Sequence, residues 1–316
     1  MVKEKRVCFR QRDLELMLFL SEYGVITNEN VKLIYKSDYY YKNRLASLAK
    51  GDMIERLYGK VILGTKGKRY LNEIGFGYRN INRDEKYKKR LERVSDIACK
   101  FKDCGWFFEP SWRCDINTYT KRGNRFVGIV SRRKREYNED EERFNKTAYI
   151  VYFLHKDITQ RELKYISKEI ERNRRNFKGL IVFTEDEKYL YKPKFDEIQY
   201  EESYIIPYDN DIWEVFRKIK EENFMHNQVE NIFGDKLVSL RDKSFYDDFY
   251  IKEDGIYTYI YYMPFANFNL MHYINFQATS HLMEGTRAKV VCLENCVEYV
   301  RKYLDEKVEV ICISIE

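Results

Sequence analysis

The 316-residue chain has none of the long apolar runs that would place it in a membrane. No stretch approaches the roughly 18 consecutive apolar residues that a spanning helix needs. The amino terminus reads VKEKRV ahead of a helix pattern, whereas a secretory signal would place an apolar segment there. We therefore expect that a membrane is not a partner.

Cysteine spacings that hold structural zinc are also missing. The seven cysteines form no C-x-x-C pair: Cys99, Cys104 and Cys114 lie five and ten residues apart, and Cys292 and Cys296 lie four apart. An odd number of scattered cysteines, in a chain with enough apolar residues for a core, indicates a reducing compartment. We expect a cytoplasmic protein with no metal and no cofactor, in which the thiols pack as small apolar groups.

Motifs of several enzyme classes are lacking as well. No Walker lysine motif, G-x-G-x-x-G or G-x-S-x-G occurs, so nucleotide hydrolysis and serine-hydrolase chemistry have no support. A tyrosine relaxase needs a metal held by clustered histidines, and the four histidines show no H-x-H or H-x-x-x-H spacing. Convergence of His272 and His281 in the fold stays open. A relaxase is therefore only an alternative.

The chain does contain ample core residues and an uneven distribution of charge. Hydrophobic residues make up 44% and aromatic residues 16% of it, enough for one large core or two to three modest ones. Residues 1–75 hold 15 Lys and Arg against 9 Asp and Glu, and residues 76–146 hold 19 against 12. Residues 147–316 reverse the balance, with 23 against 30. This asymmetry indicates a polyanionic partner for the amino-terminal part.

The first 75 residues show the patterns of three helices and a β-hairpin. Apolar residues recur at helical spacing, and Tyr58-Gly59-Lys60 has the composition of a tight turn with a basic tip. This is the order of a winged helix-turn-helix, in which the third helix enters the major groove and the hairpin tip touches the DNA backbone. The expected elements are helices over Arg12–Tyr23, Asn28–Tyr35 and 39–50, strands over Met53–Leu57 and Val61–Leu63, and a helical turn over Thr65–Leu71.

The polar side of the third helix and the hairpin supply groups suited to DNA. Base edges are read by hydrogen-bonding side chains, and phosphates are met by cations. Tyr39 and Tyr40 form an aromatic pair on a polar helix face, which calls for a partner. The expected DNA contacts are Tyr39, Tyr40, Lys42, Asn43, Arg44, Ser47, Arg56, Tyr58 and Lys60. Two alternatives stay open, namely a solvated face with Arg44 as a capped surface residue, and a protein-interaction module.

The stretch Gly75-Phe76-Gly77-Tyr78 separates this module from a highly charged helix pattern. That helix has an apolar stripe from Leu91 to Phe101, long enough to pack on a second domain. We therefore place a boundary near Gly77. The expected domains are a winged helix-turn-helix over 1–76, an α/β domain over 77–207, and a carboxy-terminal α/β segment over 208–316 that can belong to the same domain.

Residues 106–184 alternate strand and helix patterns. Strands are expected over 106–112, 114–120, 125–131, 149–154 and 180–184, with a helix that begins after Thr159. The amino-terminal segment reads RDLELMLFLSEYGVITNENVKLIYKSDYYYKNRLASLAKGDMIER. It is followed by this α-β-β-β-α-β order, in which WRCD stands at a strand start and YIVYFL leads into a helix. Together these features resemble the replication-relaxation family over about residues 10–185. Its members are DNA-binding proteins of plasmids and integrative elements in low-GC Gram-positive bacteria. The resemblance implies a role in replication, mobilisation or control of a mobile element, with replication or conjugation proteins as partners.

The same order resembles the restriction-endonuclease-like fold. Such nucleases hold Mg²⁺ with carboxylates on neighbouring strands and carry a D/E-x-K motif. Asp115 can take the first position and Glu109 lies on the neighbouring strand, but FVGIVS (126–131) and YIVYFL (149–154) contain no acid. The expected fold is therefore mixed α+β and α/β, with a degenerate endonuclease-like second domain. A metal-dependent nickase is kept as an alternative.

The last hundred residues include an aromatic segment from Tyr257 to Phe276. Tyr257, Tyr259 and Tyr261 alternate as in a strand until Pro264, and core packing is the default interpretation. If the segment instead lines an effector pocket, the protein is a ligand-responsive transcription regulator. The patterns that follow predict a strand, a helix and a strand, over AKVVCL, ENCVEYVRKYL and VEVICISI.

The sequence as a whole predicts a sequence-specific double-stranded-DNA-binding protein without catalysis of its own. One recognition helix with a small wing gives limited specificity, and paired half-sites are the usual remedy. We therefore expect a homodimer.

Overall fold

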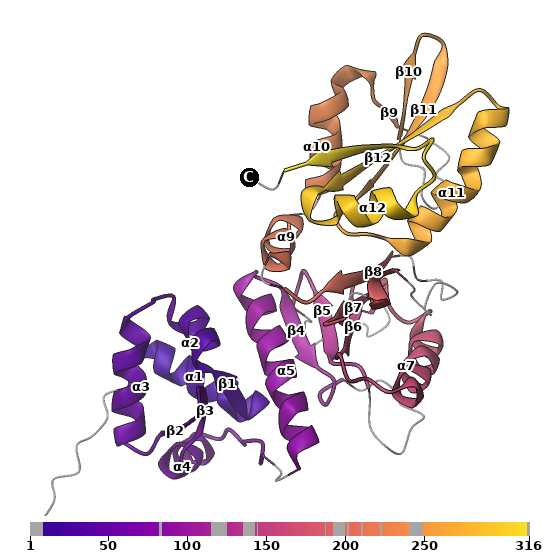
Figure 1. Cartoon of the computed structure of the whole chain (residues 1–316). Coiled ribbons are helices and arrows are strands. Elements are labelled where there is room, and N and C mark those ends of the chain that lie inside the picture. The colour runs from indigo at the N-terminus through magenta and orange to yellow at the C-terminus, as the bar shows by residue number, and fades with distance from the viewer. Residues whose placement is uncertain are drawn as a thin grey trace, which may run out of the picture. The chain divides into compact units, whose positions relative to one another are not determined.

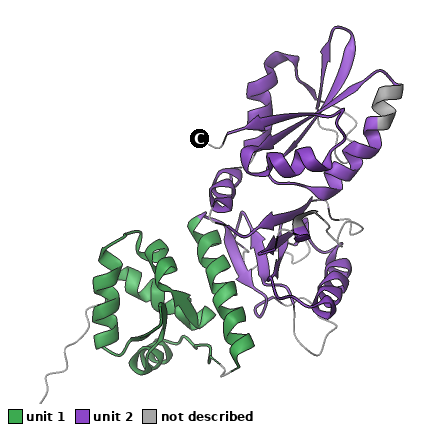
Figure 2. Ribbon diagram, viewed as in Figure 1, with its two compact units in different colours: residues 1–103 green, residues 104–316 purple. Residues whose placement is uncertain are grey.

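The computed structural model describes residues 9–81, 84–114, 125–134, 143, 145–186, 188–191, 200, 202–209, 211–221, 223–239 and 249–314. In these ranges the chain is a mixed α+β structure with three sheets (Figure 1). It divides into two compact units, residues 1–103 and 104–316 (Figure 2). None of the described helices combines the length and the apolarity needed to cross a membrane.

Unit 1 begins with three helices whose apolar sides form its core. Helix α1 (Gln11–Tyr23) is followed by Gly24, whose φ of 80° is accessible because glycine has no Cβ. Thr27 caps α2, since its Oγ1 accepts a hydrogen bond from the Asn30 backbone N–H at 3.2 Å. The helices are α1 (Gln11–Tyr23), α2 (Asn28–Tyr35) and α3 (Tyr40–Lys50).

A small antiparallel sheet and a fourth helix complete the amino-terminal core. Its strands are β1 (Val25–Thr27), β2 (Ile54–Leu57) and β3 (Lys60–Leu63), in the order β1-β3-β2, and α4 (Thr65–Glu73) follows. The pair Leu57 and Lys60 closes the β2–β3 hairpin around Tyr58 and Gly59. Both turn residues have positive φ, 44° and 81°, as a two-residue type I′ hairpin turn requires.

The charged helix α5 (Glu85–Asp103) belongs to unit 1, so this unit extends past the boundary that the sequence suggested near Gly77. Its apolar stripe contacts α1, α2 and β1 of the same unit. Polar groups add to this packing: Ser95 donates to the Val25 carbonyl at 2.5 Å, and Asn30 Nδ2 donates to Asp96 Oδ1 at 2.6 Å. The glycines before α5 therefore form a connection inside one unit.

The first sheet of unit 2 is mixed, as the sequence predicted. Strands β4, β5 and β6 pair antiparallel, and β6, β7 and β8 pair parallel. Thr159 Oγ1 accepts from the Glu162 N–H at 3.2 Å and so caps α7, the crossover helix between β6 and β7. The elements are β4 (Phe107–Pro110), β5 (Gly128–Ser131), β6 (Tyr149–Leu154), α7 (Gln160–Asn173), β7 (Gly179–Thr184), α8 (Lys188–Tyr191), β8 (Glu202–Pro207) and α9 (Ile212–Ile219).

The second sheet of unit 2 has the order β13-β12-β11-β10-β9. Strands β11, β12 and β13 pair parallel, and β9, β10 and β11 pair antiparallel. The elements are α10 (Phe224–Phe233), the 3₁₀ helix η1 (Gly234–Lys236), β9 (Val238–Ser239), β10 (Phe249–Glu253), β11 (Ile256–Met263), α11 (Phe268–Met283), β12 (Arg287–Leu293), the 3₁₀ helix η2 (Glu294–Cys296), α12 (Val297–Tyr303) and β13 (Glu309–Ile313).

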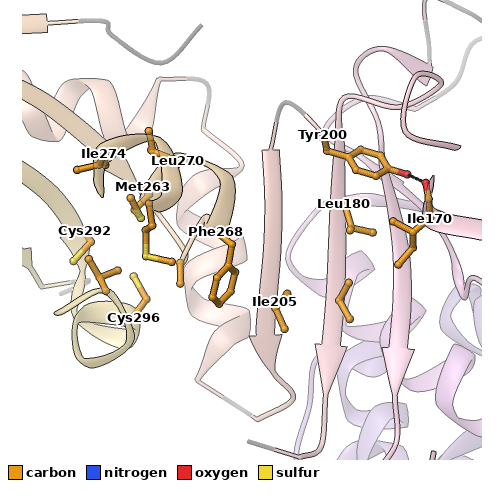
Figure 3. Close-up of a cluster of buried hydrophobic side chains, with 14 of the residues drawn as sticks. Ile170, Leu180, Tyr200, Ile205, Met263, Phe268, Leu270, Ile274, Cys292 and Cys296 are labelled. Atoms are coloured by element: carbon orange, nitrogen blue, oxygen red, sulfur yellow. Dashed lines mark hydrogen bonds between the residues drawn. The ribbon is translucent and has the colours of Figure 1, made fainter. Parts of the chain in front are cut away.

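One apolar cluster runs through both sheets of unit 2 (Figure 3). Leu180 and Ile205 contribute from the first sheet, and Phe268 of α11 and Cys292 of β12 contribute from the second part. The Tyr200 hydroxyl at the margin of this cluster donates to the Ile170 carbonyl at 2.9 Å, so its polar atom is satisfied. The continuous cluster explains why residues 104–316 form one unit.

Candidate nucleic-acid interface

Helix α3 presents one buried face and one exposed face. Tyr41, Leu45 and Leu48 point into the core. The opposite face is exposed at positions 39, 42, 43, 46 and 50, which follow the three-to-four-residue repeat of a helix. The exposed side chains are Tyr39, Lys42, Asn43, Ala46 and Lys50. Figure 1 shows α3 on the side of unit 1 away from α5, so α5 does not cover this face.

Tyr39 and Lys42 lie together at the start of this face. The Tyr39 side chain is 81% exposed, and Lys42 Nζ lies 5.9 Å from the centroid of its ring. A lysine over an aromatic ring at that distance gains a modest cation–π attraction while the ammonium stays accessible. Asn43 lies next to them with a side-chain amide that can both donate and accept hydrogen bonds.

Arg44 is held inside the helical core instead of on this face. Its Nε donates to Asp13 Oδ1 at 3.2 Å, and its Nη2 donates to Asp13 Oδ2. Asp13 on α1 is fully buried and accepts two further hydrogen bonds, from the Tyr35 hydroxyl at 2.6 Å and from the Arg10 backbone N–H at 2.9 Å. Asp13, Tyr35 and Arg44 thus tie α1, α2 and α3 together, and we call them the Asp13 network.

The Asp13 network is built around a charged carboxylate. Burial by itself raises the pKa of Asp13, but hydrogen bonds from Arg44, Tyr35 and Arg10 stabilise the charged form and bring the pKa below its ordinary value. Burial, and then the hydrogen bond to Asp13, raise the pKa of the Tyr35 hydroxyl. The hydrogen bond to Asp13 also raises the pKa of Arg44. The network is therefore an ion pair with a neutral tyrosine as a third donor.

Tyr40 and Ser47 are also less accessible than the sequence suggested. The Tyr40 ring lies 6.1 Å from the Tyr35 ring, and the Arg10 guanidinium carbon lies 5.1 Å from the Tyr40 ring centroid. Its hydroxyl is buried, without a hydrogen-bond partner among the described residues. Ser47 is half-buried. Of the two adjacent tyrosines, Tyr39 is therefore the exposed one.

Of the three hairpin residues that the sequence predicted as DNA contacts, Arg56 and Tyr58 are exposed and Lys60 is paired. Arg56, Leu57 and Tyr58 are exposed, whereas Lys60 Nζ lies 2.5 Å from Glu92 Oε1 of α5. The Lys60 ammonium is therefore paired within unit 1. The side chain of Tyr58, in the turn, is completely exposed.

The net positive charge of the chain comes from unit 1. Residues 1–103 contain 24 Lys and Arg against 14 Asp and Glu, whereas residues 104–316 contain 33 against 37. A net charge of this size on a small unit attracts polyanions over several ångströms in a salt-dependent manner. The exposed face of α3 therefore lies on the unit that carries the net positive charge.

Lys50 and the partners of Arg44 were not predicted from the sequence. The helical repeat from Lys42 and Asn43 reaches positions 46 and 50, so Lys50 could have been found by extending it. No sequence pattern indicated that Asp13 is buried and paired with Arg44, because a carboxylate near a helix start is normally a solvated cap.

Two of the residues considered for metal-dependent chemistry, Glu109 and His272, lie on different elements of unit 2, β4 and α11. Glu109 lies on β4 opposite Ile129, and Asp115 lies outside the described residues. In the described part of the chain, no three His, Cys, Asp or Glu side chains are placed to hold a metal ion. His272 Nε2 lies 2.7 Å from the Tyr303 hydroxyl, and the side chain of His281 is outside the described residues.

The aromatic segment of unit 2 divides between β11 and α11. Tyr261 is buried in the core, and Tyr257 is partly exposed, with Lys252 Nζ 5.0 Å from its ring centroid. Core packing accounts for Tyr261, and the effector-pocket alternative remains a prediction.

The chain was compared with protein-family models, curated proteins and solved structures, and none of them matches it. We therefore infer the function from the geometry of the chain itself.

Proposed function

We propose that this protein binds double-stranded DNA through the exposed face of α3. The observation that carries the proposal is this face itself: Tyr39, Lys42, Asn43 and Lys50 are accessible along one side of a helix that the Asp13 network fixes to its neighbours. The net positive charge of residues 1–103 supports a polyanionic partner.

The side chains of this face match the chemistry of a major groove. Asn43 can form the paired hydrogen bonds with which an amide reads adenine, and Lys42 and Lys50 can meet guanine acceptors or phosphates. Ala46 between them is small, so it leaves room for the helix backbone to approach the base edges. We propose that α3 is a recognition helix and that unit 1 is a winged helix-turn-helix; the element order and the sheet order β1-β3-β2 support this.

We further propose that the first sheet of unit 2 is a non-catalytic relative of the restriction-endonuclease-like fold. Its mixed sheet and the absence of acids from β5 and β6 support this. We also propose that the protein belongs to the replication-relaxation family. We propose that it acts in replication, mobilisation or transcription control of a plasmid or integrative element. In this role it would act as a homodimer with replication or conjugation proteins.

The binding proposal is tested by measuring the affinity of the full chain for a mixed-sequence 24-base-pair duplex at several salt concentrations. Loss of a lysine–phosphate contact reduces the dependence of log K on log salt by about one. Lys42→Ala with Asn43→Ala should weaken binding and lower this slope, because both side chains lie on the proposed interface.

A matched control is Lys156→Ala, which removes an exposed lysine from unit 2 and should leave the affinity unchanged. Arg44 is unsuited to this test because its loss disturbs the Asp13 network. Equal affinities for the wild type and the Lys42, Asn43 double variant would remove α3 from the interface.

A further inference from the structure

The tip of the β2–β3 hairpin displays apolar and aromatic groups on a firmly held turn. Leu57 is 46% exposed, and Tyr58 has its entire side chain in solvent. The strands remain paired up to Leu57 and Lys60, and the Gly59 carbonyl accepts a hydrogen bond from the Asn28 backbone N–H at 2.8 Å. The turn is thus anchored on both sides and holds Tyr58 in a fixed position.

Tyr58 occupies a backbone conformation that disfavours bulky residues. Its φ of 44° lies in the left-handed region, where the first position of a type I′ turn prefers Asn, Asp or Gly. A residue kept in such a conformation needs compensation from its surroundings. Packing within the described structure does not provide it, because the ring is fully exposed. The strand pairing on both sides of the turn and the Asn28–Gly59 hydrogen bond provide it instead, and they leave the ring accessible to an external contact.

The chemistry of the tip suits a base rather than a phosphate. A phosphate-contacting wing presents cations at its tip, but the Lys60 ammonium is paired with Glu92. Arg56 is exposed on the strand that leads to the tip, where it can meet a phosphate beside the point of contact. Aromatic and apolar side chains contact nucleic acid by stacking on bases or by entering between base pairs.

We propose that the hairpin tip is a wedge that places Tyr58, flanked by Leu57, against a base step of the bound DNA. This inference rests on the proposed DNA-binding function and specifies how the hairpin takes part in it. The positive charge of unit 1 selects DNA over an apolar protein surface as the partner of the tip. A wedge favours positions where the bases are already easy to separate, because unstacking costs less there.

The test compares two 24-base-pair duplexes of the same mixed sequence, one fully paired and one with a central T·T mismatch. Full-length wild type should bind the mismatched duplex more tightly. Tyr58→Asn should lose about 5- to 150-fold in affinity for the mismatched duplex, the range that corresponds to losing one base–aromatic stack. Tyr58→Phe keeps the ring and should keep the preference. Tyr58→Asn should also unfold at the same or a higher temperature than wild type, because Asn suits the turn.

The outcomes separate this inference from the proposed function. If Tyr58→Asn binds both duplexes as wild type does, while the Lys42, Asn43 double variant loses affinity, the wedge is refuted and the α3 interface stands. A wild-type protein without preference for the mismatch also refutes the wedge. If the wild type binds neither duplex at low salt, the proposed function fails, and the wedge fails with it.

Discussion

The Asp13 network gives a quantitative prediction for the stability of unit 1. Arg44→Met keeps much of the aliphatic volume of the side chain but removes the guanidinium that neutralises Asp13. The Asp13 side chain has no exposed surface and that of Arg44 is 13% exposed, so water cannot replace the lost partner at Asp13. Removing one partner of a buried ion pair costs about 3–5 kcal/mol. Since domains are stable by about 5–15 kcal/mol, we expect unit 1 to lose a large part of its stability.

Tyr35→Phe provides a graded comparison. It removes a single hydrogen bond to the Asp13 carboxylate, which retains those from Arg44 and Arg10. A hydrogen bond to a charged group contributes about 1.5–3 kcal/mol, so this variant should be destabilised less than Arg44→Met.

The measurement is urea unfolding of the full chain, followed by hydrogen exchange in peptides from residues 11–50, which report on unit 1 alone. Both variants should increase the rate of hydrogen exchange across α1, α2 and α3. The increase should be larger for Arg44→Met than for Tyr35→Phe. A loss below about 1 kcal/mol for Arg44→Met would show that the pair behaves as an exposed salt bridge, and it would refute the buried network.

The network also predicts a dependence on pH. The folded pKa of Asp13 is lower than its ordinary value of 3.8, so the folded state favours the charged carboxylate. This contribution is fully present above the ordinary pKa and is lost as the pH falls through the folded pKa. The stability difference between wild type and Asp13→Asn should therefore be constant near neutrality and shrink below about pH 4. A difference that grows on acidification would contradict the sign of the shift.

Three further predictions concern packing, a second ion pair and a thiol. A Cβ on Gly67 would lie 2.0 Å from a backbone carbonyl oxygen, whereas one on Gly77 meets nothing within 4 Å. Gly67→Ala should therefore reduce the free energy of unfolding by about 1–3 kcal/mol, measured as a lower urea midpoint, and Gly77→Ala should leave it unchanged. Lys178 Nζ lies 2.8 Å from Glu202 Oε1, and the Glu202 side chain is only 22% exposed. Lys178→Met should therefore destabilise unit 2 by about 1–3 kcal/mol, measured by hydrogen exchange in β6–β8 peptides. An unchanged exchange rate would contradict this. Burial raises the pKa of the Cys99 thiol to about 12, so mass spectrometry should find it unmodified by iodoacetamide at neutral pH until the protein is unfolded; rapid native modification would refute its burial.

Local patterns were sufficient for many elements. The expected helix Asn28–Tyr35 and the expected strand Tyr149–Leu154 coincide with α2 and β6, because helical periodicity with a threonine cap and a short, fully apolar run are strong signals. The strand β1 was not predicted, since Val25–Thr27 is only three residues long and exists through pairing with β3. The long helix α11 was missed because its aromatic residues favour strands, and only burial against the unit 2 core decides its conformation.

The candidate interface could be predicted in part. Exposure of Tyr39, Lys42 and Asn43 follows from helical spacing. The internal partners of Arg44 and Lys60 could not be foreseen, because Asp13 and Glu92 lie 31 and 32 residues away along the chain and only the tertiary fold brings them into contact. The place of α5 depends on the same kind of information, since its apolar stripe fits either unit until the contacts with α2 and β1 are known.

We propose that α3 of unit 1 contacts duplex DNA. The most direct test of this proposal is hydrogen exchange of the full chain with and without a saturating mixed-sequence duplex at low salt. We expect new protection concentrated in residues 39–50 and in the hairpin 54–63, with unit 2 peptides unchanged. Protection confined to residues 104–316, or none at all under conditions where the duplex is bound, would contradict it.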